Sequence, residues 1–303
     1  MKTAKKKLFG SKSVFEIVLF IVLAVYSLAL ITLLAWALMT SFKTKDAYDL
    51  NKLAFPSPFS FDSYINVIRG MAKGISSKTG KTYIYIETMA LNSVLYAGGC
   101  ALFNTFCTAT VAYCTSRYKG PAASFIHNLV IVSLILPIVG SLPATLEMAH
   151  NLKLVNHLYG MYVLKFSFNN MYYLIFFAFF SSMSWGYAES AFIDGASHFT
   201  VYFRIMLPLA IKLFLTVFLL FFISYWNDYQ TPLMFLKNMP TLALGLFAFM
   251  DGDVKKPPNG VGEYNTIPAQ IAAGVIVFAP VFALFVIFRN KIMGNLTEGG
   301  IKE

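Results

Sequence analysis

The sequence predicts an all-α membrane protein with six transmembrane helices. Of its 303 residues, 57% are hydrophobic and only 13% are charged, whereas soluble domains are about 25% charged. The mean hydropathy is +0.64. Six apolar stretches are each long enough to cross a bilayer, which takes about 20 residues in a helix. A soluble protein of this length would need a polar coat that so few charged residues cannot form.

The six predicted spans can be placed by their apolar runs. They cover residues 14–40, 91–113, 125–149, 160–182, 209–236 and 267–288. The first span follows a basic segment and ends near Ala35-Trp36-Ala37, so a cleaved signal peptide is an alternative interpretation. Its apolar run is longer than the 7–15 residues of a signal peptide. We therefore interpret this span as a retained anchor.

The basic N-terminus sets the predicted orientation. Five lysines precede or begin the first span, and such residues favour the cytoplasmic side. With six spans both termini are then cytoplasmic, residues 1–13 as a basic tail and residues 290–303 as a C-terminal tail around a membrane domain of residues 14–289. The net charge of +10 thus indicates topology rather than nucleic-acid binding.

The residue types that usually carry catalysis or metal binding show no matching spacing. None of the four histidines lies in a metal-ligand motif. Cys100, Cys107 and Cys114 recur every seven residues, about 10.5 Å along a helix, too far for a disulfide. No phosphate-binding loop or nucleophile elbow occurs. We expect neither a metal nor a cofactor, and no enzymatic activity in this chain.

The segment of residues 187–208 between the fourth and fifth spans is the most informative. Gly195 predicts a bend between two short helical pieces, Asp194 could cap the second piece, and Pro208 breaks the chain before the fifth span. The segment is too apolar for a free loop and predicts burial on a protein surface. That surface is either another chain or the protein's own helices. The apolar residues are Phe192, Phe199, Val201, Phe203 and Ile205.

The same segment resembles the EAA loop of ABC-importer permeases, which reads E-A-A-x-x-x-G, nine residues, then I-x-L-P. The residues at these positions are Glu189, Ser190, Ala191, Gly195, Ile205, Leu207 and Pro208. The one departure is serine for the first alanine, a small-for-small change. The run Asp194-Gly195-Ala196 resembles the carbohydrate branch, in particular MalG-like subunits.

Further fragments resemble the same branch in order along the chain. They are Asn92-Ser93, Tyr225-Trp226-Asn227-Asp228, Pro232-Leu233, Pro240-Thr241-Leu242 and residues 296–302. The resemblance implies the type I ABC-importer permease architecture in a bacterial plasma membrane. Residues 68–85 look longer than such permeases usually have there, so details of this outer loop do not carry over.

The resemblance also implies a mechanism and partners. The EAA loop would dock on a cytoplasmic ATPase dimer, which hydrolyses ATP. Glu189 would be the polar anchor, Ala191 and Ala196 would permit close approach, and Gly195 would shape the turn. The C-terminal tail would reach the ATPase interface. The other partners would be a second, MalF-like permease, an extracellular or periplasmic sugar-binding protein, and membrane lipid.

The outer part of the fifth span is a candidate substrate path. Its aromatic faces and amides suit the rings and hydroxyls of a sugar. An interfacial aromatic belt with helix–helix hydrogen bonds is the alternative. The residues are Tyr225, Trp226, Asn227, Asp228 and Gln230. The predicted function is carbohydrate uptake, most simply of an oligosaccharide. The alternatives are a self-sufficient secondary transporter, a membrane scaffold and an ABC permease for a non-sugar solute.

Overall fold

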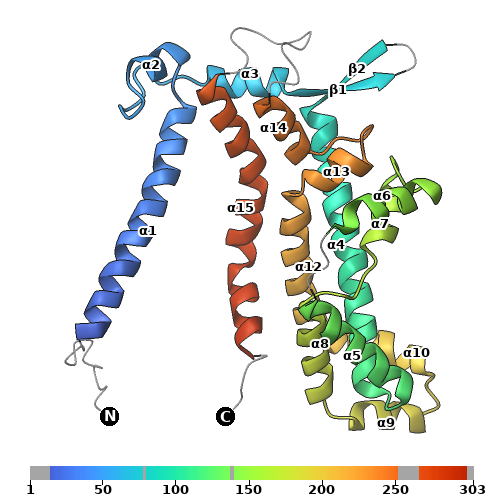
Figure 1. The fold of residues 1–303 in the computed structure, drawn as a ribbon. Helices are drawn as coiled ribbons and strands as arrows, with labels where there is room; N and C mark the ends of the chain where they lie inside the picture. Colours follow the sequence, from blue (N-terminus) through green and yellow to red (C-terminus); the bar gives the residue numbers. More distant parts are fainter. Residues whose placement is uncertain (1–13, 78–79, 137–139, 252–265, 299–303) are drawn as a thin grey trace.

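The computed structural model describes residues 14–77, 80–136, 140–251 and 266–298, and they form a helical protein (Figure 1). From the N-terminus the elements are α1 (Val14–Ser41), α2 (Lys45–Leu50), α3 (Asp62–Gly70), β1 (Ala72–Ser77), β2 (Gly80–Tyr85), α4 (Ile86–Arg117), α5 (Pro121–Ile135), α6 (Ser141–Asn151) and α7 (Leu158–Lys165). They continue with α8 (Tyr172–Ser182), α9 (Gly186–Ile193), α10 (His198–Val201), the π-helix η1 (Tyr202–Met206), α11 (Leu207–Leu209), α12 (Ile211–Trp226), α13 (Gln230–Phe235), α14 (Leu242–Met250) and α15 (Ile267–Glu298).

Three described helices are long and apolar enough to cross a membrane: α1 with 28 residues, α4 with 32, and α15 over 22 residues, Ile267–Phe288. A fourth crossing is possible if His198–Leu209 and Ile211–Trp226, bent by 75° from each other, count as one span. The all-α prediction is confirmed, but the apolar runs do not form six unbroken helices.

The other predicted spans are interrupted. The run 125–149 becomes α5 and α6, and the run 160–182 becomes α7 and α8 with an irregular segment at residues 166–171. That segment contains Ser167, Asn169 and Asn170, whose side chains compete with backbone hydrogen bonds. The run 209–236 is broken at residues 227–229, between α12 and α13. The apolar content of the sequence therefore predicted where the membrane segments lie, but it did not predict where their helices are interrupted.

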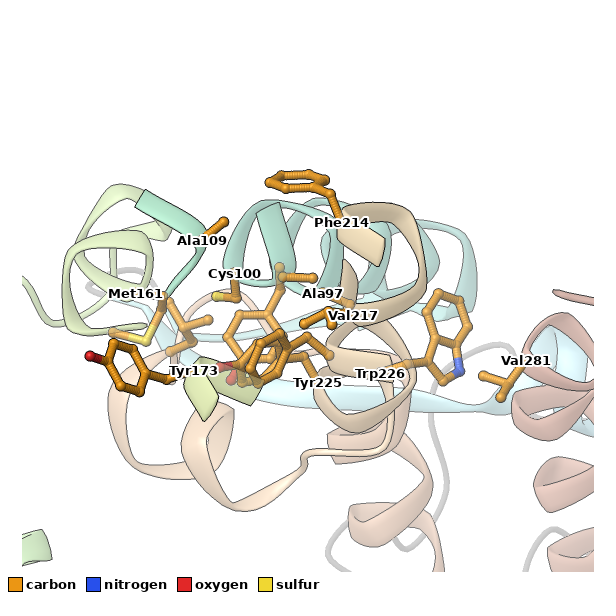
Figure 2. Packing of buried hydrophobic residues seen from close by; sticks show 14 of the residues in the cluster. Ala97, Cys100, Ala109, Met161, Tyr173, Phe214, Val217, Tyr225, Trp226 and Val281 are labelled. Atoms are coloured by element: carbon orange, nitrogen blue, oxygen red, sulfur yellow. The ribbon is translucent and has the colours of Figure 1, made fainter. Parts of the chain in front are cut away.

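Helix α4 is at the centre of the packed part of the molecule. It contacts α5, α7, α8, α12 and α14. Small residues on α4, including Ala97 and Cys100, face the larger Val217 and Tyr225 of α12 (Figure 2). Close packing through small side chains is the usual source of helix association in lipid. Trp226 reaches from α12 to α15, where its Nε1 donates a 3.0 Å hydrogen bond to the carbonyl of Val277.

Helix α1 stands apart from this core (Figure 1). It contacts α15, and the apolar window that qualifies it as a span has no buried residue. Its exposed side chains are almost all apolar, as expected for a helix surrounded by lipid or by another membrane chain.

The two ends of the molecule differ (Figure 1). At the upper end lie α2, α3, α13, α14 and the antiparallel hairpin of β1 and β2, in which Ala72 pairs with Tyr85. At the lower end lie α9 and α10, the start of α1 and the last turns of α15. The hairpin adds a small two-stranded sheet to the outer loop of residues 68–85, whose details the family resemblance did not supply.

Candidate coupling segment and substrate path

The sequence segment of residues 187–208 folds into two helical pieces at the lower end of the molecule. The first is α9, which contains Glu189, Ser190 and Ala191. It ends at Ile193 with Asp194 as its C-cap. The next residue, Gly195, has a φ of +82°, the left-handed conformation that glycine adopts without strain. The amide of Gly195 donates to the carbonyl of Phe192 at 3.0 Å, and the amide of Ala196 donates to that of Ala191 at 2.9 Å. This hydrogen-bond pair is a Schellman motif, so Gly195 supplies the predicted bend.

The second helical piece is capped by Ser197. Its Oγ accepts a 3.3 Å hydrogen bond from the amide of Thr200. The sequence pattern predicted Asp194 in this role, but Asp194 is the C-cap of α9 instead. Both are good capping residues, and the left-handed turn at Gly195 lies between them, so only the residue after the turn can cap the next helix.

Residues 198–209 continue as one helix with a π-helical turn, η1, in its middle. The amide of Leu207 donates to the carbonyl of Tyr202, five residues back. Pro208 has no amide hydrogen to donate. The helix ends at Ala210, which is buried, and α12 leaves at an angle of 75°. π-Turns are frequent at functional sites, and this one lies directly before the bend.

The segment presents one apolar face outward and buries another in the chain itself. Ile193 and Phe199 are 85% and 78% exposed, and Tyr187 is 55% exposed. Ala188 and Val201 are fully buried. The carboxylates of Glu189 and Asp194 are exposed. Large apolar side chains at this exposure favour a contact with another protein surface.

Several motif residues pack within the chain. Ala191 is only 9% exposed, and Ala196 is half-buried. Their small side chains therefore permit close packing of α9 and of the turn after it against the chain's own core. Ile205 and Leu207 also pack partly against that core. Ser190 is exposed, and its Oγ donates to the carbonyl of Gly186 at 2.9 Å.

The candidate substrate-path residues surround the break between α12 and α13. Tyr225 and Trp226 are buried, whereas Asn227 and Gln230 are exposed and Asp228 is half-buried. The Nδ2 of Asn227 donates to the carbonyl of Ile223 in its own helix. The cluster thus contains two aromatic residues that are buried and two amide side chains that are exposed.

Asp228 links the break to α4. Its Oδ2 accepts a 2.9 Å hydrogen bond from the hydroxyl of Tyr96, and its Oδ1 accepts one of 3.0 Å from the amide of Thr231 in α13. The carboxylate therefore fixes the start of α13 to the upper part of α4.

A buried polar network lies about two to three turns further down α4. The Nδ2 of Asn104 donates to the hydroxyl of Tyr225 at 2.6 Å. The Nδ2 of Asn170, in the irregular segment, donates to Thr108 at 2.8 Å, and Thr108 donates to the carbonyl of Ser167 at 3.2 Å. Irregular backbone within a membrane needs such partners. Asn104 and Asn170 were not among the predicted site residues, although polar side chains in apolar spans are a signal of functional or structural importance.

Two of the family-like fragments meet at the upper end. The amide of Leu242 donates a 2.7 Å hydrogen bond to the Oγ of Ser93. Thr241, which is 1% exposed, caps α14 by accepting from the amide of Leu244. The fragment at residues 296–302 lies partly outside the described residues.

Comparison with known proteins identifies the family. Residues 108–293 match the family described as binding-protein-dependent transport system inner membrane component. The chain is 24% identical over 280 residues to the diacetylchitobiose uptake system permease protein NgcG of Streptomyces coelicolor, covering 91% of this chain and 86% of that protein. It is 24% identical to the arabinooligosaccharides transport system permease protein AraQ of Bacillus subtilis, over 82% and 80% of the two chains.

A solved structure shows the same architecture. A chain from the crystal structure of a bacterial ABC transporter involved in the import of the acidic polysaccharide alginate superposes with a TM-score of 0.73. The match covers 93% of this chain and 98% of that one, at 20% sequence identity. With the family match extending over more than half of its length, the chain belongs to the binding-protein-dependent transport system inner membrane components, the permease subunits of ABC importers in the plasma membrane.

Proposed function

We propose that this chain forms, with a second, MalF-like permease, the path for carbohydrate uptake across a bacterial plasma membrane. Its substrate class is an oligosaccharide. The observation that carries the proposal is the exposed apolar face of residues 187–208, which combines an EAA-like motif with Ile193 and Phe199 exposed beside the turn at Gly195.

The lower end of the molecule faces the cytoplasm in this proposal. The coupling segment, residues 187–208, then lies where an ATPase dimer can reach it, and the start of α1 and the last turns of α15 lie on the same side. Fully burying Ile193 or Phe199 in an ATPase groove would stabilise the complex by about 1.5–3 kcal/mol each. Glu189 is the polar anchor of this contact, and the partner ATPase hydrolyses ATP.

Support for a sugar substrate comes from two sources. Relatives with similar sequences are named as permeases for diacetylchitobiose and for arabinooligosaccharides. The exposed amides of Asn227 and Gln230 beside buried aromatic rings provide the mixture of polar and apolar groups that suits a sugar. A separate binding protein delivers the solute, in keeping with the family.

The test is transport by the complete importer in liposomes, containing this chain, the partner permease, the ATPase pair and the binding protein. A panel of disaccharides, trisaccharides and tetrasaccharides should include one that accumulates when ATP is supplied. Accumulation of only amino acids or phosphate would contradict the sugar assignment, and uptake by this chain without the ATPase would contradict the ABC mechanism.

A charge substitution tests the docking face itself. Ile193→Asp should prevent co-purification of the ATPase pair, because a carboxylate would have to be buried without a partner. Leu53→Asp, at a side chain 77% exposed near the upper end, is the matched control and should leave co-purification unchanged. Equal retention of the ATPase by both variants would contradict the assignment of the docking face.

A further inference from the structure

The coupling segment is attached to the lower end of α4 on both sides of the exposed turn. On the side before α9, the Nη2 of Arg117 donates a 2.6 Å hydrogen bond to the carbonyl of Met183. The same guanidinium lies over the ring of Trp185, 5.6 Å from its centroid, within the range of a cation–π interaction. Trp185 directly precedes α9. Arg117 therefore fixes the chain at the point where the coupling segment begins.

The side after α9 is attached by aromatic side chains. The hydroxyl of Tyr118 and the Nδ1 of His198 are hydrogen-bonded at 2.9 Å. The His198 ring also contacts Phe192 of α9, with ring centroids 4.8 Å apart. His198 is the first residue of α10, so the two helical pieces and the end of α4 meet at one imidazole.

A third attachment is at the π-helix. The hydroxyls of Thr110 on α4 and Tyr202 in η1 are 2.8 Å apart. The ring of Tyr202 lies 4.8 Å from that of Tyr113, which is also on α4. Tyr202 is 5% exposed. The π-turn thus places a buried phenol against α4, eight residues before the bend at Ala210.

Two routes lead from the coupling segment to the substrate-path residues. The covalent route passes Ala210, where the helix axis turns by 75°, and a bend of this kind can absorb a displacement. The other route is α4, an unbroken helix of 32 residues without proline, about 48 Å long. Higher on the same helix, Asn104 and Tyr96 hydrogen-bond to Tyr225 and Asp228.

We propose that α4 transmits the movement of the coupling segment to the substrate path, with Arg117 as the positioning residue that fixes segment to helix. The inference rests on the proposed docking of residues 187–208 on an ATPase. Movement of the docked segment displaces the lower end of α4 through Met183 and Trp185. The displacement reaches the break between α12 and α13 through hydrogen bonds made by α4 itself.

The experiment uses the complete importer in liposomes and measures ATP hydrolysed per solute transported. Arg117→Met should keep ATPase binding, because the exposed docking residues are unchanged, and should raise this ratio at least about fivefold, the lower end of usual coupling between sites. Arg117→Lys keeps the cation and an N–H donor and should restore most of the coupling. An unchanged ratio in Arg117→Met, with transport and hydrolysis reduced together, would overturn the proposal.

If the importer carrying Arg117→Met is not produced in the membrane, a second variant tests the same proposal. Tyr202→Phe removes only the hydroxyl that contacts Thr110 and should raise the same ratio by a smaller factor, while an unchanged ratio would overturn the proposal. The docking assignment is tested separately. If Ile193→Asp releases the ATPase but the Arg117 and Tyr202 variants stay coupled, the α4 route is wrong and the docking face stands. If Ile193→Asp keeps the ATPase, the docking assignment itself fails.

Discussion

The side chain of Asn92, at the upper end of α4, donates a 3.0 Å hydrogen bond to the carbonyl of Pro240, 148 residues later in the chain. Asn92 is 7% exposed, so water cannot easily replace this bond. The neighbouring Ser93 accepts from Leu242. Together the two bonds fix the segment before α14 to α4, and they join two family-like fragments that are far apart in the sequence.

Replacing Asn92 by leucine should therefore destabilise the upper end of the molecule. The carbonyl of Pro240 would lose its partner, and interhelical hydrogen bonds in membranes contribute about 0.6–2 kcal/mol. Thermal unfolding of the purified importer should show a lowered Tm for Asn92→Leu. Asn227→Leu, which removes an exposed amide that bonds within its own helix, is the control and should cost less. Equal Tm values for the two variants would show that the bond to Pro240 contributes no stability.

Gly195 should tolerate replacement according to backbone conformation rather than size. No atom lies within 4 Å of the position that a Cβ would take, yet φ is +82°. A left-handed conformation costs most residues about 1–2 kcal/mol, and asparagine less. Gly195→Leu should abolish ATP-driven uptake while membrane insertion stays intact, and Gly195→Asn should retain most of the uptake. Normal uptake by the leucine variant would exclude a coupling role for this turn.

Gly160 on α7 should not tolerate replacement even by alanine, the smallest residue with a side-chain carbon. A Cβ there would overlap the backbone carbonyl of Leu154, and overpacking costs about 1–3 kcal/mol. Gly160→Ala should lower the Tm of the importer. Gly274→Ala in α15 is the matched control, since nothing lies within 4 Å of its Cβ position and alanine favours a helix. A Tm that falls equally in both variants would argue against a specific close contact at Gly160.

Substitutions at Asn227 and Trp226 should have different effects, the first on substrate binding and the second on helix packing. Asn227→Ala should change the solute concentration for half-maximal uptake by about 2- to 10-fold, the effect of one hydrogen bond, without reducing assembly. Trp226→Phe should instead lower the Tm, because it removes the bond to the carbonyl of Val277. Unaltered affinity and selectivity in Asn227→Ala would remove this residue from the substrate path.

The sequence predicted the membrane-embedded, helical character well because it depends on summed apolar content, which a linear scan measures. The breaks depend on single residues. Ser167, Asn169 and Asn170 are averaged with the apolar Phe166 and Phe168, so a hydropathy window passes over the irregular segment. Its backbone is stable there because Thr108 of α4 supplies a partner, and no local pattern reveals that contact.

The candidate coupling segment was predictable in outline and not in its contacts. The local pattern gave the bend at Gly195, since glycine is the residue that a left-handed turn requires. It predicted Asp194 as the cap of the second helical piece, a role that Ser197 has in the structure. Nor did it indicate that Arg117, far earlier in the chain, lies against Trp185. Such attachments depend on the packing of α4, which brings distant residues together.

The uneven lengths of the helices have a consequence for biogenesis. Helices α1, α4 and α15 each satisfy the length for crossing a bilayer alone, so an insertion machinery can release them into lipid one at a time. Helices α7 and α8, which contact α4, have 8 and 11 residues, and their ends leave backbone groups that lipid cannot satisfy. These shorter helices can settle in the membrane only after α4 is there to receive them. The order in which the segments enter the bilayer is therefore already constrained by where the helices break.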